Sequence, residues 1–162
     1  MSRQLFLIRH AETSDKEIGE TDLDRKLTFK GIRDAQNLNA FLAGVSPNLQ
    51  VIIHSHAVRT THTAKLLAES NPTIQLITQP SIYHATPNNL LKLIQQLNNE
   101  WDAVVIVGHN PTISALAQDL TDQAIGGFAP ATVAGFQFQV DKWAEVMPRN
   151  GLLTLFKEPN IL

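Results

Sequence analysis

The 162-residue chain contains no cysteine. This absence excludes disulfide bonds, thiolate metal sites and a cysteine nucleophile together. Long hydrophobic runs are also missing. No apolar stretch approaches the roughly 20 residues of a membrane-spanning helix, and the apolar segment near the N-terminus is too short for a secretory signal. We therefore expect a cytoplasmic protein that has no membrane attachment.

An excess of charge of one sign is lacking as well. Thirteen Lys and Arg residues stand against 15 Asp and Glu residues, so the formal net charge is −2. A chain so close to neutrality has no global attraction for nucleic acid or for an anionic membrane, and any anion site must come from local arginines. The length, and the absence of linkers or internal repeats, predict a single domain over residues 1–162.

Short apolar segments alternate with helical patterns along most of the chain. We predict strands at residues 4–9, 51–53, 74–77 and 103–107, and helices at residues 28–45, 61–68, 86–97 and 113–120. This alternation predicts an α/β fold, a three-layer α/β/α sandwich whose mainly parallel sheet has helices on both faces. Residues 135–140 and 152–156 predict a C-terminal β-hairpin-like pair with a turn near 148–151, at or near a sheet edge.

Three of the predicted strands end in residues that carry chemistry. Arg9 and His10 follow the first strand, Arg59 lies just beyond the second, and His109 follows the 103–107 strand. Because parallel strands place their carboxyl ends at one edge of the sheet, we expect these four side chains to converge. Two arginines and two histidines around one point predict a site for a dianion.

The residue types at this site indicate phosphoryl chemistry. Arginine offers a planar fork of donors that matches phosphate oxygens. A neutral imidazole is a competent nucleophile near pH 7, and a backbone carbonyl can fix its other ring nitrogen. The residues themselves therefore favour His10 as a nucleophile and Arg9 as a phosphate clamp.

Four ordered motifs carry a resemblance to a known family. They are Leu7-Ile8-Arg9-His10-Ala11-Glu12, Leu27-Thr28 with Gly31, Ser55-His56-Ala57-Val58-Arg59-Thr60 with Thr63-Ala64, and Val107-Gly108-His109-Asn110-Pro111. The set resembles the histidine phosphatase (phosphoglycerate mutase-like) superfamily, and within it the short SixA-type phosphohistidine phosphatases. The resemblance implies that His10 is transiently phosphorylated, that Arg9 and Arg59 hold the phosphoryl oxygens, and that His109 completes the pocket. It also implies that neither a metal nor an organic cofactor is used.

Two positions depart from the common superfamily pattern. Ala11 stands where the motif usually has glycine, and alanine recurs there in the SixA-like branch. Many relatives place a glutamate as general acid after the third strand, and the equivalent position before Thr86-Pro87 is His84. A histidine with an ordinary pKa of about 6.5 is able to donate a proton at neutral pH. Glu12 is the other candidate for the proton donor.

The substrate is predicted to be a phosphohistidine on another protein. A protonated imidazole leaves more readily than an alkoxide, so a strong acid is dispensable. The chain is also too compact for long insertions that roof the site, which suits phosphate displayed on a protein partner. The alternatives are a small-metabolite phosphomonoesterase or mutase of the same superfamily, or a phosphate-binding module without catalysis. Arg25 is either a further anion contact at the rim or a solvated surface charge.

Three further histidines, His54, His56 and His62, raise the question of a metal site, because a His-x-His pattern places two rings on one face of a strand. No carboxylate is patterned with them, so we predict no metal. His54 and His62 are read as packing or surface residues, whereas His56, Ser55 and Tyr83 are expected at the rim or wall of the pocket. A monomer is plausible, although the sequence does not determine the oligomeric state.

Overall fold

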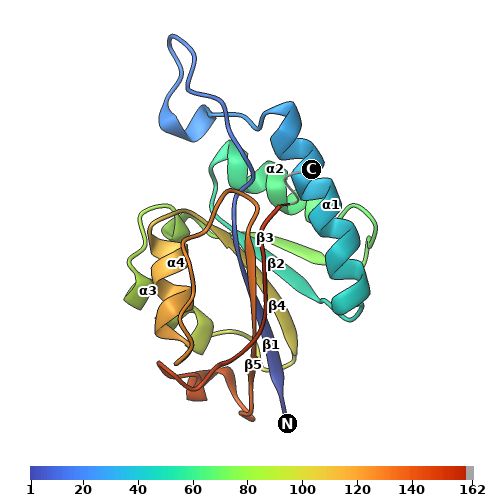
Figure 1. The fold of residues 1–162 in the computed structure, drawn as a ribbon, viewed down its shortest axis with the longest axis vertical. Helices are drawn as coiled ribbons and strands as arrows, with labels where there is room; N and C mark the ends of the chain where they lie inside the picture. Colours follow the sequence, from blue (N-terminus) through green and yellow to red (C-terminus); the bar gives the residue numbers. More distant parts are fainter. Residues whose placement is uncertain (160–162) are drawn as a thin grey trace.

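A six-stranded sheet lies at the centre of the fold, between two pairs of helices (Figure 1). The computed structural model describes residues 1–159. The strands are β1 (Arg3–Arg9), β2 (Val51–His54), β3 (Gln75–Thr78), β4 (Ala103–Gly108), β5 (Val133–Phe138) and β6 (Leu152–Lys157). The helices are α1 (Phe29–Val45), α2 (Val58–Leu67), α3 (Pro87–Gln95) and α4 (Thr112–Asp119), with short 3₁₀ turns η1 (Asp22–Asp24), η2 (Pro80–Ile82) and η3 (Trp143–Glu145).

The order of the strands in the sheet is β3-β2-β4-β1-β5-β6. Strands β3, β2, β4 and β1 run parallel, whereas β5 is antiparallel to β1 and β6 is antiparallel to β5. Arg9 pairs with Gly108, and His54 pairs with Val107. The carboxyl ends of β1, β2 and β4 therefore meet at one edge of the sheet, as the sequence predicts.

Each face of the sheet packs against its own pair of helices. Phe6 and Ile8 lie in the same buried cluster as Leu38 of α1 and Ala64 of α2. Leu5 and Leu7 lie in the cluster that contains residues of α3 and α4. Because successive side chains of a strand point to opposite faces, a strand that is covered on both sides must be apolar throughout. This confirms the predicted three-layer α/β/α sandwich. No helix within residues 1–159 is long and apolar enough to cross a membrane.

The C-terminal pair lies at the sheet edge as predicted, but its strand bounds and its connection differ from the prediction. The first strand covers 133–138 instead of 135–140. The predicted turn is present at 147–150, where the backbone nitrogen of Asn150 donates to the carbonyl oxygen of Met147 at 3.3 Å, but residues 139–146 separate it from β5. The intervening segment contains η3, in which Trp143 is fully buried and its indole nitrogen donates a hydrogen bond to the carbonyl oxygen of Trp101 at 2.8 Å. Trp143 belongs to the buried cluster that contains residues of α3 and α4, so the connection follows a longer path than a hairpin turn.

The first turn of α1 packs against the backbone that follows His10. A Cβ at Gly31 would lie 2.2 Å from the carbonyl oxygen of Glu12, which already accepts a hydrogen bond from the backbone nitrogen of Thr28. We expect Gly31→Ala to lower the free energy of unfolding by about 1–3 kcal/mol, because a backbone atom has to move. Urea unfolding measures this change.

Gly44 provides the matched control on the same helix. A Cβ at Gly44 meets nothing within 4 Å. Gly44→Ala should therefore leave stability unchanged or raise it by about 0.5–1 kcal/mol, since alanine is the better helix former. Equal stability of Gly31→Ala and Gly44→Ala would contradict the close contact between α1 and the residues after His10.

Candidate active site

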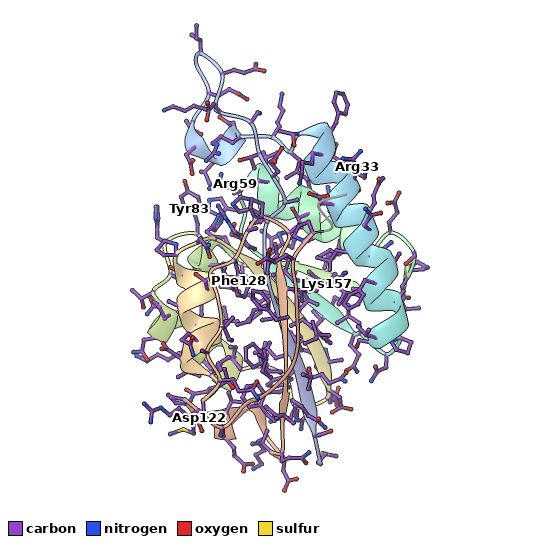
Figure 2. The ribbon with its side chains drawn as sticks, viewed as in Figure 1. Arg33, Arg59, Tyr83, Asp122, Phe128 and Lys157 are labelled. Atoms are coloured by element: carbon purple, nitrogen blue, oxygen red, sulfur yellow. The ribbon has the colours of Figure 1, made fainter. Side chains whose placement is uncertain are left out.

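The two motif histidines leave neighbouring strands at the carboxyl edge of the sheet. Their ring centroids lie 5.4 Å apart, with the planes tilted by 55°. Arg59 lies in the first turn of α2, and Figure 2 shows it together with Tyr83 at the same end of the sheet. Arg9, Arg59 and His109 all act electrostatically on His10, so the four predicted side chains form one group. The expected convergence of His10, His109, Arg9 and Arg59 is present in the structure.

His10 is held as a neutral ring with a defined tautomer. Its Nδ1 lies 2.8 Å from the carbonyl oxygen of Ala11. A carbonyl oxygen can only accept, so the ring proton is on Nδ1 and the lone pair is on Nε2. Burial lowers the pKa of His10 to about 3, and the positive charges of Arg59 and Arg9 act in the same direction. A neutral imidazole whose Nε2 is unprotonated is the form that a nucleophile needs.

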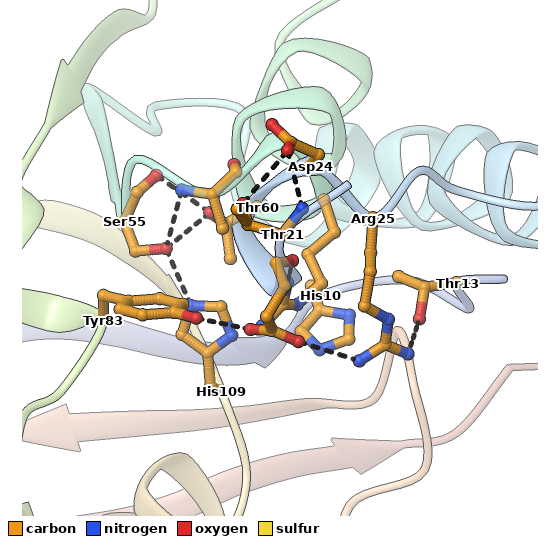
Figure 3. Close-up of polar contacts among 12 residues, drawn as sticks. His10, Thr13, Thr21, Asp24, Arg25, Ser55, Thr60, Tyr83 and His109 are labelled. Carbon is orange, nitrogen blue, oxygen red and sulfur yellow. Dashed lines mark hydrogen bonds and ion pairs between the residues drawn. The ribbon is translucent and has the colours of Figure 1, made fainter. Parts of the chain in front are cut away.

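His109 is oriented by a pair of buried hydroxyl groups. Its Nε2 lies 2.7 Å from Oγ of Ser55, and that oxygen lies 2.6 Å from Oγ1 of Thr60 (Figure 3). The Thr60 hydroxyl donates in turn to the carbonyl oxygen of Ser55 at 2.8 Å, so a chain of hydrogen bonds fixes the orientation of the His109 ring. Burial, followed by the charge of Arg59, lowers the pKa of His109 to about 4. The sequence placed Ser55 at the pocket rim, and the structure gives it this orienting contact.

The two arginines are fixed through their terminal nitrogens. Nη1 of Arg9 donates a hydrogen bond to the carbonyl oxygen of Phe128 at 2.9 Å. Nη1 and Nη2 of Arg59 donate to the carbonyl oxygen and to Oδ2 of Asp22, at 2.7 and 2.9 Å. Burial, and then the neighbouring charge of Arg25, lower the pKa of Arg9. The guanidinium groups are thus held in place by contacts that leave their Nε atoms free.

Three buried nitrogen atoms of this group have no hydrogen-bond partner within residues 1–159. They are Nε of Arg9, Nε of Arg59 and Nδ1 of His109. A buried polar atom without a partner is costly, and natural proteins tolerate it mainly where a ligand supplies the missing bond. Two cationic forks and an imidazole are partners for an anion with several oxygen atoms, and a phosphoryl group meets that description.

Asp22 is the site residue that sequence reasoning missed. Its carboxylate lies among Arg59, Arg25 and Tyr83, and the Tyr83 hydroxyl donates a hydrogen bond to Oδ2. This hydrogen bond and the contacts with Arg59 hold the pKa of Asp22 well below its ordinary range. The same hydrogen bond to Asp22 raises the pKa of Tyr83. Asp22 belongs to an acidic loop without periodicity, so no local signal distinguishes it from the carboxylates around it.

Arg25 and Tyr83 both lie at the site. Nη1 of Arg25 is 3.3 Å from Oδ1 of Asp22, and Nη2 donates to Oγ1 of Thr13 at 2.6 Å (Figure 3). The ring of Tyr83 meets that of His109 edge-on, with centroids 5.3 Å apart. Tyr83 therefore forms a wall of the site. The positive charge of Arg25 lowers the pKa of Arg9, so the two side chains are close to each other. This favours Arg25 as an anion contact at the rim of the site over a solvated surface charge.

The two predicted proton donors occupy different surroundings. Oε1 of Glu12 accepts a hydrogen bond from the Thr28 hydroxyl at 2.8 Å, which ties this carboxylate to the N-terminus of α1. His84 is exposed, and its ring packs against the outer side of Tyr83, with centroids 4.4 Å apart. Neither residue is bonded to the arginines of the site, and the carboxylate that is bonded to them belongs to Asp22.

The remaining histidines are dispersed. His54 is buried at the end of β2, with Nδ1 at 2.8 Å from the carbonyl oxygen of Ser55, and burial lowers its pKa. His56 is exposed beside Tyr83, and His62 is half-buried on α2. Across residues 1–159, no three His, Cys, Asp or Glu side chains are grouped so as to hold a metal ion.

The lowered pKa of His10 predicts a loss of stability in mild acid. The unfolded chain binds the proton near pH 6.5, whereas the native ring binds it only near its pKa of about 3. The contribution of the neutral His10 to the free energy of unfolding is therefore fully present above pH 6.5, and it decreases as the pH falls below this value. Between pH 7 and pH 5, His10 should contribute a loss of about 2 kcal/mol. Urea unfolding of the wild type and of His10→Ala at both pH values measures this difference, and equal losses in both proteins would contradict it.

The α/β sandwich, whose strand ends bring together two arginines and two histidines with unpaired buried nitrogen atoms, is that of a phosphatase. Residues 5–83 match the family model of the histidine phosphatase superfamily (branch 1). An uncharacterized protein of Mycobacterium tuberculosis (strain H37Rv) is 29% identical over 167 residues, which cover 94% of this chain and 99% of the relative. The chain is therefore similar to the histidine phosphatase superfamily over residues 5–83.

Solved structures agree with this assignment. A protein from Nakamurella multipartitia that is assigned as the phosphohistidine phosphatase SixA is 28% identical, with a TM-score of 0.85 over 98% of this chain and 97% of that one. A SixA protein complexed with tungstate is 19% identical, with a TM-score of 0.82 over 96% and 97%. A mycobacterial glucosyl-3-phosphoglycerate phosphatase has the same fold, at 18% identity and a TM-score of 0.74 over 98% and 100%.

Proposed function

We propose that this protein is a phosphohistidine phosphatase, which removes the phosphoryl group from a phosphohistidine on another protein through a phospho-His10 intermediate. The observation that carries the proposal is the neutral His10, whose Nε2 is unprotonated, among the unpaired nitrogens of Arg9, Arg59 and His109. The partner is a phosphorylated protein in the cytoplasm. Arg9, Arg59 and His109 hold the phosphoryl oxygens.

The reaction proceeds in two displacements. The Nε2 lone pair of His10 forms a bond to phosphorus while the bond from phosphorus to the substrate nitrogen breaks, and the electron pair of that bond stays on the leaving ring. A substrate imidazole that carries a proton on its other nitrogen leaves as a neutral ring. Water then attacks phospho-His10, and phosphate is released. The arginine forks stabilise the charge on the phosphoryl oxygens in both displacements.

The preference for phosphohistidine follows from the acid–base groups near His10. An alkoxide leaving group needs a protonated acid, but Asp22 is held as a carboxylate and Glu12 is bonded to Thr28. An imidazole leaves without such an acid. The SixA proteins with the same fold carry the name of this activity, which supports the same substrate class here.

A substrate comparison tests the proposal. Purified protein is given a phosphohistidine-bearing protein, p-nitrophenyl phosphate and a sugar phosphate, and phosphate release is measured for each. We expect the phosphohistidine protein to react fastest, and the sugar phosphate, an alkyl ester, to react slowest. Faster hydrolysis of the sugar phosphate would instead indicate a small-metabolite phosphatase. A protein that binds tungstate but hydrolyses none of the three would be a phosphate-binding module.

A further inference from the structure

The loop between β1 and the 3₁₀ turn η1 projects beyond the rest of the molecule at the end where β1 finishes (Figure 1). Residues 14–21 form the projecting part, which we call the arm. Both ends of the arm are fixed to residues of the phosphate site. Nε of Arg25 donates a hydrogen bond to the carbonyl oxygen of Ser14 at 3.1 Å, and Asp22, which follows the arm, accepts hydrogen bonds from Arg59. The arm therefore stands at the rim of the site.

The tip of the arm is a formed turn that presents an isoleucine to solvent. The backbone nitrogen of Glu20 donates to the carbonyl oxygen of Glu17 at 3.0 Å, and the backbone nitrogen of Glu17 donates to Oε1 of Glu20 at 2.8 Å. Gly19 has a φ of 86°, as the third residue of a type II turn requires. Ile18 is the second residue of this turn, and its side chain is fully exposed. An ordered turn thus places an apolar side chain where the free protein does not bury it.

Two further apolar side chains are exposed at the same edge of the sheet. Phe29 is the first residue of α1 and is 93% exposed, and the exposed Val58 is the first residue of α2, immediately before Arg59. The first turn of α1 packs against Glu12, and α2 follows β2 directly, so both helices begin at this edge. Apolar side chains that are exposed on several elements around one site are typical of a surface that binds another protein.

The arm is negatively charged, whereas the phosphate site beside it contains arginines. Within residues 14–21, Asp15, Glu17 and Glu20 stand against the single Lys16. The side chains of Asp15 and Glu17 are exposed. Carboxylates at the rim repel a small anionic phosphate and attract a basic protein surface. A phosphoryl group that enters past the arm is therefore favoured when basic residues surround it on its carrier.

We propose that the arm, together with Phe29 and Val58, is the docking surface for the phosphoprotein substrate, and that it binds a basic and apolar surface beside the phosphohistidine of that protein. This inference rests on the proposed function and identifies the surface that selects its substrate. His10 is 7% exposed, so a phosphohistidine reaches it only when the carrier protein contacts the rim of the site. The apolar tip of the arm is then buried in the complex, which stabilises the complex.

Synthetic phosphohistidine peptides and free phosphohistidine test this surface. One peptide has lysine and leucine residues around the phosphohistidine, and the other has glutamate and serine residues at the same positions. We expect the wild type to hydrolyse the lysine–leucine peptide with a kcat/KM about tenfold or more above that of the glutamate–serine peptide. Ile18→Ser should lower kcat/KM for the lysine–leucine peptide about tenfold through KM, and leave kcat/KM for free phosphohistidine within about twofold of the wild type.

A double variant, Asp15→Asn with Glu17→Gln, tests the charge of the arm. We expect kcat/KM for the lysine–leucine peptide to fall with added salt in the wild type, and to fall less steeply in the double variant, because salt screens the attraction between the arm and the lysines. Glu20 is kept in this variant because its carboxylate closes the turn. An equal salt dependence in both proteins would overturn the charge part of the proposal.

Met147→Ser is the matched control for the loss of an exposed apolar side chain. Met147 lies in the segment in which Arg149 donates a backbone hydrogen bond to Asp119, at the last residue of α4, away from the strand ends that hold the site. This variant should hydrolyse both peptides as the wild type does. Thermal unfolding of Ile18→Ser should also match the wild type, since the exposed side chain packs against no core residue.

The outcomes separate docking from chemistry. Equal losses with the lysine–leucine peptide and with free phosphohistidine in Ile18→Ser would overturn the proposal, because the arm would then act on the site itself. An unchanged rate with the peptide in Ile18→Ser would overturn it as well, and so would a wild type that hydrolyses both peptides equally. If the wild type hydrolysed no phosphohistidine substrate at all, the proposed function would fail first, which is a different result.

Discussion

His10→Ala removes phosphatase turnover and leaves the fold intact. In the proposed mechanism the variant lacks the nitrogen that accepts the phosphoryl group, so no covalent intermediate forms, and we expect turnover to fall by on the order of 10⁴-fold or more. The residual rate comes from Arg9, Arg59 and His109, which still hold the substrate and its charge. Steady-state hydrolysis of the phosphohistidine protein measures the loss, and acid-labile phosphate on the protein should disappear with it.

Stability should change little in this variant at neutral pH. His10 is 7% exposed and neutral, so its removal leaves neither a buried charge nor an unpaired partner, apart from the carbonyl of Ala11. Thermal unfolding checks that the loss of activity is chemical. His62→Ala is the matched control because it removes another histidine, which is half-buried on α2. If His10→Ala retained turnover above a few per cent, another residue would have to be the nucleophile.

General geometry made much of the site predictable from sequence. Arg9, His10 and His109 were identified because parallel strands bring their carboxyl ends together, and any chain with this alternation must do the same. Arg59 was identified from its place just beyond the second predicted strand. The burial of β1 and β4 on both faces was likewise visible in their unbroken apolar runs. These inferences depend on periodicity and topology, which a single sequence records.

The contacts of Asp22 could not be derived in this way. They join a loop residue to Arg59 and Tyr83, 37 and 61 positions away, and no periodicity governs a loop. The path of residues 139–151 could not be predicted for the same reason, because it depends on the burial of Trp143 against distant segments. In both cases long-range contacts determine the structure, whereas sequence patterns describe repeated local ones.

Arg59→Ala carries the second large expected loss, and it separates phosphate binding from nucleophilic chemistry. Arg59 is 5% exposed. Its guanidinium donates a hydrogen bond to Asp22, and its positive charge lowers the pKa of both histidines. Its removal deprives the transferring phosphoryl group of a planar fork of donors in a buried site. We expect kcat/KM to fall by about 10³-fold, which corresponds to about 4 kcal/mol of transition-state stabilisation.

Arg59→Lys should recover little of this loss, because a lysine ammonium cannot present two parallel donors to the phosphoryl oxygens while it also bonds Asp22. Tungstate binding, measured by calorimetry, should weaken in both variants and remain unchanged in Arg33→Ala, which removes an exposed arginine of α1 (Figure 2). Loss of Arg59 should also raise the pKa of His10 and His109, because its charge contributes to lowering both. Tungstate binding to Arg59→Ala at wild-type strength would mean that the anion is held elsewhere, and would contradict the pocket assembled from the strand ends.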